Sequence, residues 1–156
     1  MEIRDNLIPA DLVETIERSM QGESFPWFAT QNPDDLSRDW KLTHPLFIYT
    51  EWYNRHDWFD ELLTYLPIKT LVRAKANLQV GGSLGEWHSD ECDPDPTAMT
   101  SVYYVNTCNG YTEFVDGDKV ESKAGRVVTF HNAMQHRAVM ATDVAARFVI
   151  SVNYFV

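Results

Sequence analysis

The sequence predicts a mainly β fold, an antiparallel barrel or sandwich, supported by helices near the N-terminus. Helical spacing of apolar residues occurs only before residue 68. From Ile68 onward, β-branched and aromatic residues alternate with polar ones in short runs separated by turn residues. No crossover helix interrupts these runs, so the strands are expected to pair antiparallel.

Two amphipathic helices are predicted before the β-rich region. Residues 9–20 begin with proline and carry apolar residues every three or four positions, and Gly22 follows as a stop signal. Residues 56–67 place large apolar side chains on one side and end at Pro67. These helices are expected to support the β core.

The remaining segments are read from turn residues and alternation. Residues 31–39 are polar and predict an exposed loop, whereas residues 45–54 fit a buried strand or a helix, with a strand favoured at their start. Six further strands are predicted at 70–80, 97–106, 111–115, 119–122, 126–131 and 145–155.

Length and composition favour one globular domain and exclude several functions. The chain has 156 residues, of which 44% are hydrophobic, too many for a disordered protein. A net charge of −10 argues against a nucleic-acid partner. No apolar run approaches the roughly 20 residues of a membrane span and no secretory leader opens the chain, so we expect a cytoplasmic protein without a membrane partner. Cys92 and Cys108 are predicted to be free thiols.

One short motif has the spacing of metal ligands. His88 and Asp90 stand two residues apart at the end of an extended stretch, so their side chains face the same way. One further histidine would complete a facial triad of two His and one carboxylate, and His136 is the natural candidate. The motif alone is weak, because a polar strand end gives the same pattern.

Arg147 is the unusual residue of the last predicted strand. Alternation places it on one face with Val149, Ser151 and Asn153. If that face lines the barrel, the buried guanidinium needs an anion, and a bound dicarboxylate would be a good partner. The other interpretation is an arginine at a strand end that reaches solvent.

Six motifs follow one another in order over residues 70–156. They are W-H-S-D at 87–90, S-V-Y-Y-V-N at 101–106, G-Y-T-E-F at 110–114, A-G-R-V-V-T-F at 124–130, H-R-A-V at 136–139 and R-F-V-I-S-V-N-Y-F at 147–155. In this order they resemble the Fe(II)- and 2-oxoglutarate-dependent oxygenases, in particular the prolyl hydroxylase-like branch.

This resemblance implies a double-stranded β-helix, or jelly-roll, barrel. The whole chain, residues 1–156, would be a single oxygenase domain with a helix-containing support region at 1–67 and a barrel core at 68–156. The resemblance also implies Fe(II) bound by His88, Asp90 and His136, 2-oxoglutarate as cosubstrate, O2, and ascorbate as reductant.

The resemblance assigns the cosubstrate contacts as well. Arg147 would pair with the distal carboxylate of 2-oxoglutarate, and the hydroxyl of Tyr104 would donate a hydrogen bond to it, with Tyr103 as the fallback on the opposite face. Further candidates for the cosubstrate pocket are Asn77, Thr112 and Ser151. Each of these also has an ordinary packing role as an alternative.

The substrate is the least determined feature. The motif order favours a prolyl residue of a peptide or protein, with a small amino acid or another protein side chain as alternatives. The acidic loop 91–97 is either a lid or a solvated loop. Gly110-Tyr111 replaces the usual Gly-Gly of the resembled family, and Asn153 replaces an aromatic residue.

Two other functions also fit the metal-ligand motif and the β-rich pattern. A cupin-type metal enzyme without oxygenase activity and a catalytically silent peptide-binding barrel are the alternative functions. The acidic charge argues against the nucleic-acid demethylases that share oxygenase chemistry. We expect His131 at the surface or behind the metal ligands, and His44 and His56 at the surface.

Overall fold

The computed structural model describes residues 1–30, 41–81, 84–90 and 95–156. The predicted loop at 31–39 and most of the loop at 91–97 lie outside these ranges. Within them the helices are α1 (Ala10–Gln21) and α2 (Asp57–Leu63). The strands are β1 (Glu2–Arg4), β2 (Phe28–Thr30), β3 (Lys41–Ile48), β4 (Glu51–Trp52), β5 (Thr70–Val80), β6 (Ala98–Tyr104), β7 (Tyr111–Phe114), β8 (Lys119–Glu121), β9 (Val127–His131), β10 (His136–Val139) and β11 (Ala146–Phe155).

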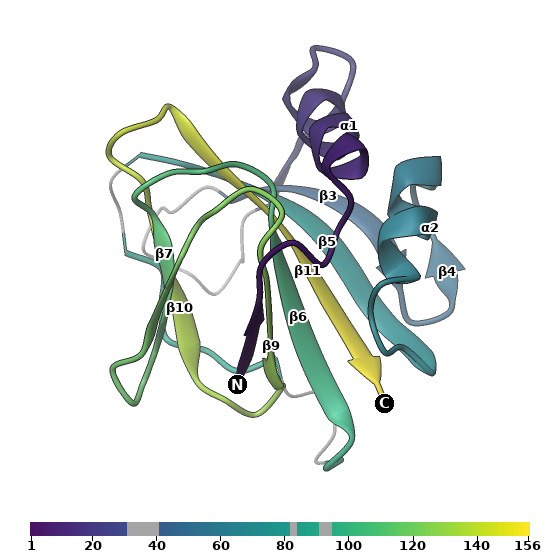
Figure 1. Ribbon diagram of the computed structural model, residues 1–156, viewed down its shortest axis with the longest axis vertical. Helices are drawn as coiled ribbons and strands as arrows, with labels where there is room; N and C mark the ends of the chain where they lie inside the picture. The colour runs from purple at the N-terminus through teal and green to yellow at the C-terminus, as the bar shows by residue number, and fades with distance from the viewer. Residues whose placement is uncertain (31–40, 82–83, 91–94) are drawn as a thin grey trace.

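The strands form two antiparallel sheets that face each other (Figure 1). The large sheet has the order β1-β9-β6-β11-β5-β3-β2, with β4 paired to β3, and the small sheet has the order β10-β7-β8. Sequential strands are repeatedly placed in different sheets, as in a jelly roll. The predicted mainly β fold with two supporting helices is confirmed.

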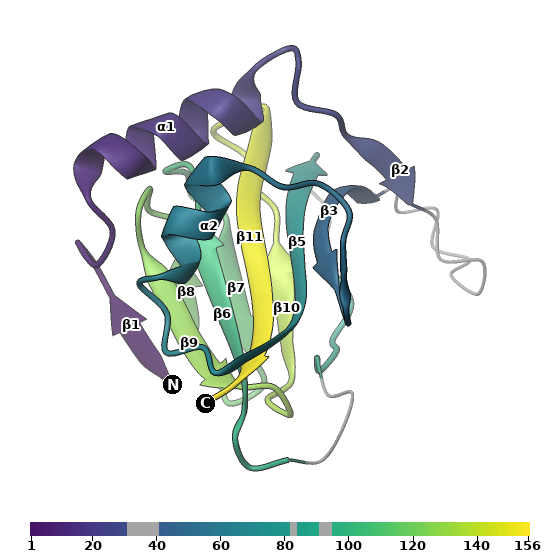
Figure 2. The ribbon, with the colours of Figure 1, turned by 90° about the vertical axis from the view of Figure 1, so that its right-hand side faces the viewer.

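Two apolar layers hold the molecule together. Between the sheets lie Val102, Tyr104, Phe114, Val120, Val128, Phe130 and Val149. The outer face of the large sheet is covered by α1 and α2 (Figure 2), and β11 buries Phe148, Ile150 and Val152 against them. Because a strand alternates its side chains, β11 serves both layers, and its other face, which carries Arg147, points to the barrel interior.

Both helices begin as predicted, and the second is shorter than predicted. Helix α1 follows Pro9 and buries Leu12, Ile16 and Met20. Helix α2 ends at Leu63 because the next residues change to the tighter i to i+3 pattern, with the Leu66 amide donating to the Leu63 carbonyl at 3.2 Å. Pro67 therefore follows a 3₁₀-like turn and not a full α-helical turn.

The N-terminal region contributes strands to the sheet as well as helices. β1 pairs with β9, and β3 extends the large sheet beside β5. The strand predicted at the start of 45–54 is present but begins earlier, at Lys41. β10 was not among the predicted strands, because it follows residues 132–135, whose polar character indicates a break between strands.

His44 is not at the surface, so that expectation is wrong. Its side chain is 0% exposed because β3 turns this residue toward the helical layer. Its ring lies 4.2 Å from that of Phe25, its Nδ1 donates to the Pro26 carbonyl at 2.7 Å, and its Nε2 lies 3.1 Å from Nε2 of His56. His56 is half-buried by the same contact.

Cys108 is buried and free, whereas Cys92 lies outside the described residues. Neither of the helices in the described ranges is long and apolar enough to cross a membrane.

Candidate metal and cosubstrate site

An extended segment, residues 84–90, runs antiparallel to β10 and brings distant residues together. The Gly85 amide donates to the Ala138 carbonyl at 2.8 Å, and His88 and His136 exchange backbone hydrogen bonds at 3.0 and 2.9 Å. A Cβ on Gly85 would lie 3.0 Å from the Ala138 carbonyl oxygen, so the close approach favours glycine. This pairing places His88 directly opposite His136.

The three predicted metal ligands lie together. One donor atom from each of His88, Asp90 and His136 falls within 4.8 Å of the others. The two imidazole rings are 4.4 Å apart between centroids, and His136 Nε2 is 3.8 Å from Asp90 Oδ2. Two imidazoles and one carboxylate, with an open side, form the donor set of a facial triad.

Backbone contacts orient both imidazoles for coordination. His88 Nδ1 lies 3.0 Å from the Glu86 carbonyl oxygen, and His136 Nδ1 lies 2.9 Å from that of Met134. Because a carbonyl only accepts, each Nδ1 carries the hydrogen, and each Nε2 keeps its lone pair for a metal. Burial also lowers the pKa of His136, which favours the neutral, metal-binding form.

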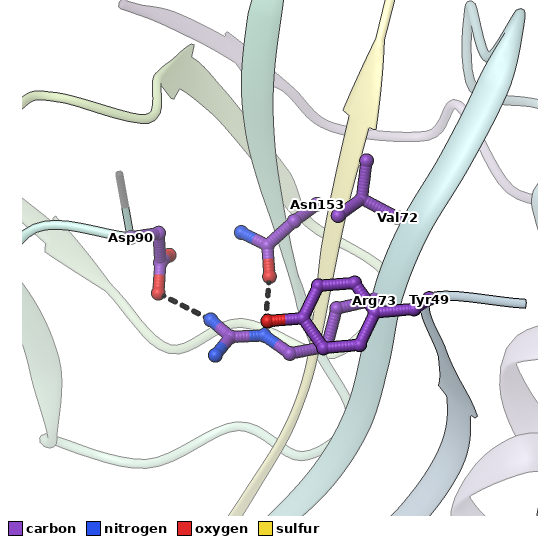
Figure 3. Close-up of a pocket in the computed structure, with 5 residues that line it drawn as sticks. All are labelled: Tyr49, Val72, Arg73, Asp90 and Asn153. Atoms are coloured by element: carbon purple, nitrogen blue, oxygen red, sulfur yellow. Dashed lines mark hydrogen bonds and ion pairs between the residues drawn. The ribbon is translucent and has the colours of Figure 1, made fainter. Parts of the chain in front are cut away.

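Asp90 is held by a closed ring of hydrogen bonds, which we call the Asp90 ring (Arg73, Asp90, Thr100 and Asn153; Figure 3 shows all but Thr100). Arg73 donates through Nη2 to Asp90 Oδ1 at 2.8 Å and through Nε to Asn153 Oδ1 at 2.9 Å. Asn153 Nδ2 donates to Thr100 Oγ1 at 2.8 Å, and Thr100 donates to Asp90 Oδ2 at 3.1 Å. Each carboxylate oxygen of Asp90 accepts a hydrogen bond within the ring, so the carboxylate is fixed in one orientation.

Arg147 lies deep between the sheets and is 1% exposed. Its guanidinium donates to Ser122 Oγ at 2.7 Å, to Thr112 Oγ1 at 3.1 Å and to Gln79 Oε1, and it lies 5.4 Å from the Tyr104 ring centre. All these partners are neutral, and burial lowers the pKa of Arg147. Within the described residues no carboxylate pairs with it, which leaves a buried cation suited to an anionic ligand.

The residues around Arg147 explain parts of the sequence pattern. A Cβ on Gly110 would lie 2.8 Å from Arg147 Cδ, so only glycine leaves room for the guanidinium's stem. The Tyr104 hydroxyl donates to Thr112 Oγ1 at 2.8 Å, and burial raises the pKa of Tyr104, which keeps it a neutral donor. Tyr103 packs instead into the layer beneath the helices.

The two ends of the site are joined by the inward face of β5. Asn77, predicted as a pocket residue, donates to Ser151 Oγ at 3.3 Å, so these two candidates lie side by side between the metal-ligand group and Arg147. His131 is not part of the ligand group, and its Nε2 lies 3.2 Å from the Asp95 carbonyl oxygen. Asp95 belongs to the acidic loop whose residues 91–94 are not described.

Sequence reasoning missed several polar residues of the site. Arg73 and Gln79 have the same alternation phase as Asn77 in the predicted strand 70–80, so the phase that selected Asn77 could have found them. Thr100 shares a phase with Tyr104 in the same way. Ser122 lies in the predicted strand 119–122 with the same phase as the buried Val120, so alternation could have found it as well.

The fold matches several solved structures over nearly the whole chain. A prolyl-4-hydroxylase from Pseudomonas putida has a TM-score of 0.73 and 16% identity, covering 99% of this chain and 91% of that one. A Trichoplax adhaerens prolyl hydroxylase in complex with a hypoxia inducible factor peptide fragment has a TM-score of 0.72 and 17% identity, covering 99% and 82%. SnoK, a non-heme alpha ketoglutarate dependent carbocyclase from nogalamycin biosynthesis, has a TM-score of 0.74 and 12% identity, covering 98% and 78%.

No protein-family model and no curated protein matches the sequence. At identities of 11–17%, the structural matches establish the architecture and leave the chemistry to the site residues. The chain therefore has the double-stranded β-helix fold of the prolyl hydroxylases and other 2-oxoglutarate-dependent oxygenases.

Proposed function

We propose that the protein is an Fe(II)- and 2-oxoglutarate-dependent dioxygenase that acts as one domain over residues 1–156. In the proposed reaction a substrate C–H bond, O2 and 2-oxoglutarate give C–OH, succinate and CO2, and all atoms and electrons are accounted for. The observation that carries the proposal is that His88, Asp90 and His136 offer a facial donor set to the same barrel interior into which the buried Arg147 points.

His88, Asp90 and His136 would hold the metal, which when bound supplies the redox chemistry for activating dioxygen. Arg147 would bind the distal carboxylate of 2-oxoglutarate through charge-assisted hydrogen bonds, exchanging one of its neutral partners for the anion. Tyr104, already beside Thr112 and the guanidinium, would donate the second hydrogen bond. Asn77, Thr112 and Ser151 would line the cosubstrate between these two ends.

The same residues distinguish this function from the two alternatives. The reaction of a cupin-type isomerase or lyase does not require a buried arginine without an acidic partner at the far end of the barrel. A silent peptide-binding barrel has no use for two imidazoles whose Nδ1 atoms are both tied to carbonyl groups. Both features are expected if a metal and a dicarboxylate bind together.

A prolyl residue of a peptide or protein is the proposed substrate. Two of the matched structures are named as prolyl hydroxylases, and one of them holds a peptide fragment. This support concerns similar folds, and SnoK shows that the same architecture also carries a carbocyclase. The substrate therefore has to be tested separately from the oxygenase reaction.

The test measures succinate from purified protein supplied with Fe(II), ascorbate and 2-oxoglutarate, with and without a library of capped proline-containing peptides. Turnover should appear in the wild type and in His131→Ala, and should fall to the iron-only blank in His88→Ala and Asp90→Ala. A peptide that is a substrate should gain one oxygen atom by mass spectrometry. Folded wild-type protein that binds neither the metal nor 2-oxoglutarate and forms no succinate would refute the oxygenase assignment. Protein that binds both but forms no succinate above the blank with any peptide would refute the prolyl substrate.

A further inference from the structure

Beyond the groups used so far, the inward face of β5 carries two cations close to the metal-ligand group. Arg73 belongs to the Asp90 ring, and Lys75 stands two residues further along the same face, opposite Ser151 of β11 and Pro45 of β3. Lys75 is half-buried, and burial together with the nearby Arg73 lowers its pKa. In the described part of the chain, the side-chain ammonium of Lys75 has no hydrogen-bond or ion-pair partner.

The charges of the proposed loaded site leave these cations uncompensated. A divalent metal with Asp90, and dianionic 2-oxoglutarate with Arg147, are together neutral. Arg73 and Lys75 then add two positive charges to a half-buried space inside a protein whose net charge is −10. Such charges are costly unless an anion joins them, because the surrounding dielectric is lower than that of water.

A pocket beside Arg73 provides the space for that anion (Figure 3). It opens to solvent, which accounts for part of its roughly 230 Å³ of empty space, and it is lined by Tyr49, Val72, Arg73, Asp90 and Asn153. Arg73 donates to the Asp90 ring through Nε and Nη2, so its Nη1 remains free to donate to a ligand. The side chain of Arg73 is 37% exposed, so a ligand can reach it from solvent. The small side chain of Asn153, where the resembled family has an aromatic residue, helps to keep this space open.

The rim of the pocket has a strained residue. Tyr49 adopts φ 56°, which is uncommon for a residue other than glycine, and its amide donates to the Val72 carbonyl at 2.7 Å. Its side chain is 68% exposed beside the opening. Strained residues of this kind gather at ligand-binding sites, which agrees with a pocket that receives a ligand.

We propose that Arg73 and Lys75 form a carboxylate-binding subsite for the substrate, so that the substrate carries a carboxylate next to the C–H bond that is oxidised. This inference rests on the proposed oxygenase function and narrows its substrate class. The carboxylate belongs either to a free acid of amino-acid size or to an acidic side chain beside the target residue of a peptide. An uncharged prolyl peptide lacks this group.

The first test measures binding to protein loaded with Ni(II) and 2-oxoglutarate, by isothermal titration calorimetry. The probes are the free amino acids, including L-proline, each beside its primary amide, and the capped peptide Gly-Pro-Asp beside Gly-Pro-Asn. The carboxylate probe of at least one pair should bind about 10- to 100-fold more tightly than its amide partner. A free acid as the better ligand identifies the first source, and the Asp peptide identifies the second.

The variants Lys75→Met and Lys69→Met form a matched pair, because Lys69 is exposed just before the same strand. Lys75→Met should weaken binding of the selected carboxylate about 10- to 100-fold and leave 2-oxoglutarate binding unchanged, and Lys69→Met should change neither. A larger loss of 2-oxoglutarate affinity than of carboxylate affinity would assign Lys75 to the cosubstrate and overturn the proposal.

The two levels of the hypothesis fail in different ways. If wild-type protein binds neither Ni(II) nor 2-oxoglutarate, the oxygenase function itself is wrong, and the subsite with it. If both bind but every carboxylate probe binds no better than its amide, only the carboxylate subsite is wrong. An uncharged capped peptide that binds more tightly than every carboxylate probe also overturns the subsite.

Discussion

Replacing Arg147 by Met is the sharpest test of the cosubstrate site. Methionine fills much of the same volume without a charge, and removing a buried cation that has only neutral partners should leave the apo protein folded. The lost guanidinium would leave the distal carboxylate of 2-oxoglutarate without its counterion. We therefore expect the fold to persist and the response to 2-oxoglutarate to disappear.

The size of the effect follows from ligand linkage. At a 2-oxoglutarate concentration 100 times the Kd, binding stabilises the folded wild type by about 2.7 kcal/mol, or roughly 5–11 °C in Tm for a chain of this size. Losing one partner of a buried charge pair costs about 3–5 kcal/mol, which weakens binding more than about 100-fold. At the same ligand concentration the stabilisation then drops below about 0.4 kcal/mol, or about 1–2 °C.

The assay is thermal unfolding in Ni(II), with and without 2-oxoglutarate, monitored by circular dichroism. Arg18→Met, on the exposed face of α1, is the control and should keep the full shift. If Arg147→Met folds and still shows the wild-type shift with 2-oxoglutarate, Arg147 does not bind the cosubstrate. The inference that the buried Arg147 guanidinium binds a carboxylate of 2-oxoglutarate would then be wrong.

Three further predictions concern single side chains. Thr100→Val removes the hydroxyl that donates to Asp90, and should weaken Ni(II) binding about 10- to 100-fold by calorimetry, with the fold retained. His44→Met should destabilise the protein at pH 7 in chemical denaturation. This difference from wild type should shrink toward pH 5, because burial lowers the pKa of His44 and the unfolded wild type gains a proton that the folded state resists. Asp5→Asn should cost less than about 1 kcal/mol at pH 7, because its ion pair with Arg126 is partly exposed. Because Arg126 holds the pKa of Asp5 well below its usual range, this cost should begin to fall as the pH drops through about 4 and should disappear only at still more acidic pH.

Matched controls make these outcomes decisive. Thr70→Val, at an exposed strand end, should keep the metal affinity, and Asp118→Asn, also exposed, should keep the stability at pH 7. Equal metal affinity in Thr100→Val and wild type would mean that the Asp90 ring does not position the ligand. A difference between His44→Met and wild type that grows on acidification would contradict a neutral buried imidazole.

More of the fold than of the candidate site could be predicted from the sequence. Alternation located the long strands well, since residues 70–80 and 145–155 match β5 and β11 almost to the residue. It failed for β10, whose four residues owe their conformation to pairing with β7 and to the backbone of residues 84–90. Short strands of this kind are fixed by tertiary contacts and have little local signal.

The same limit applies to individual polar residues. His88, Asp90 and His136 were predicted to meet, and the structure brings their donor atoms together. Alternation could have marked Arg73, Gln79 and Thr100 as inward-facing, but which of them meets Asp90 or Arg147 depends on how the strands pair. His44 was misplaced because a histidine in a polar context gives no sign that its strand faces a helical layer.

The metal-ligand group also connects the two sheets. His136 belongs to the small sheet, whereas Asp90 is anchored through Arg73 and Thr100 to the large one. A metal ion bound by these residues would link the two sheets of the barrel at a place where only a few backbone hydrogen bonds connect them. Amide hydrogen exchange along β10 should then slow when the metal is bound. It should become faster again at this end of the barrel when a chelator removes the metal.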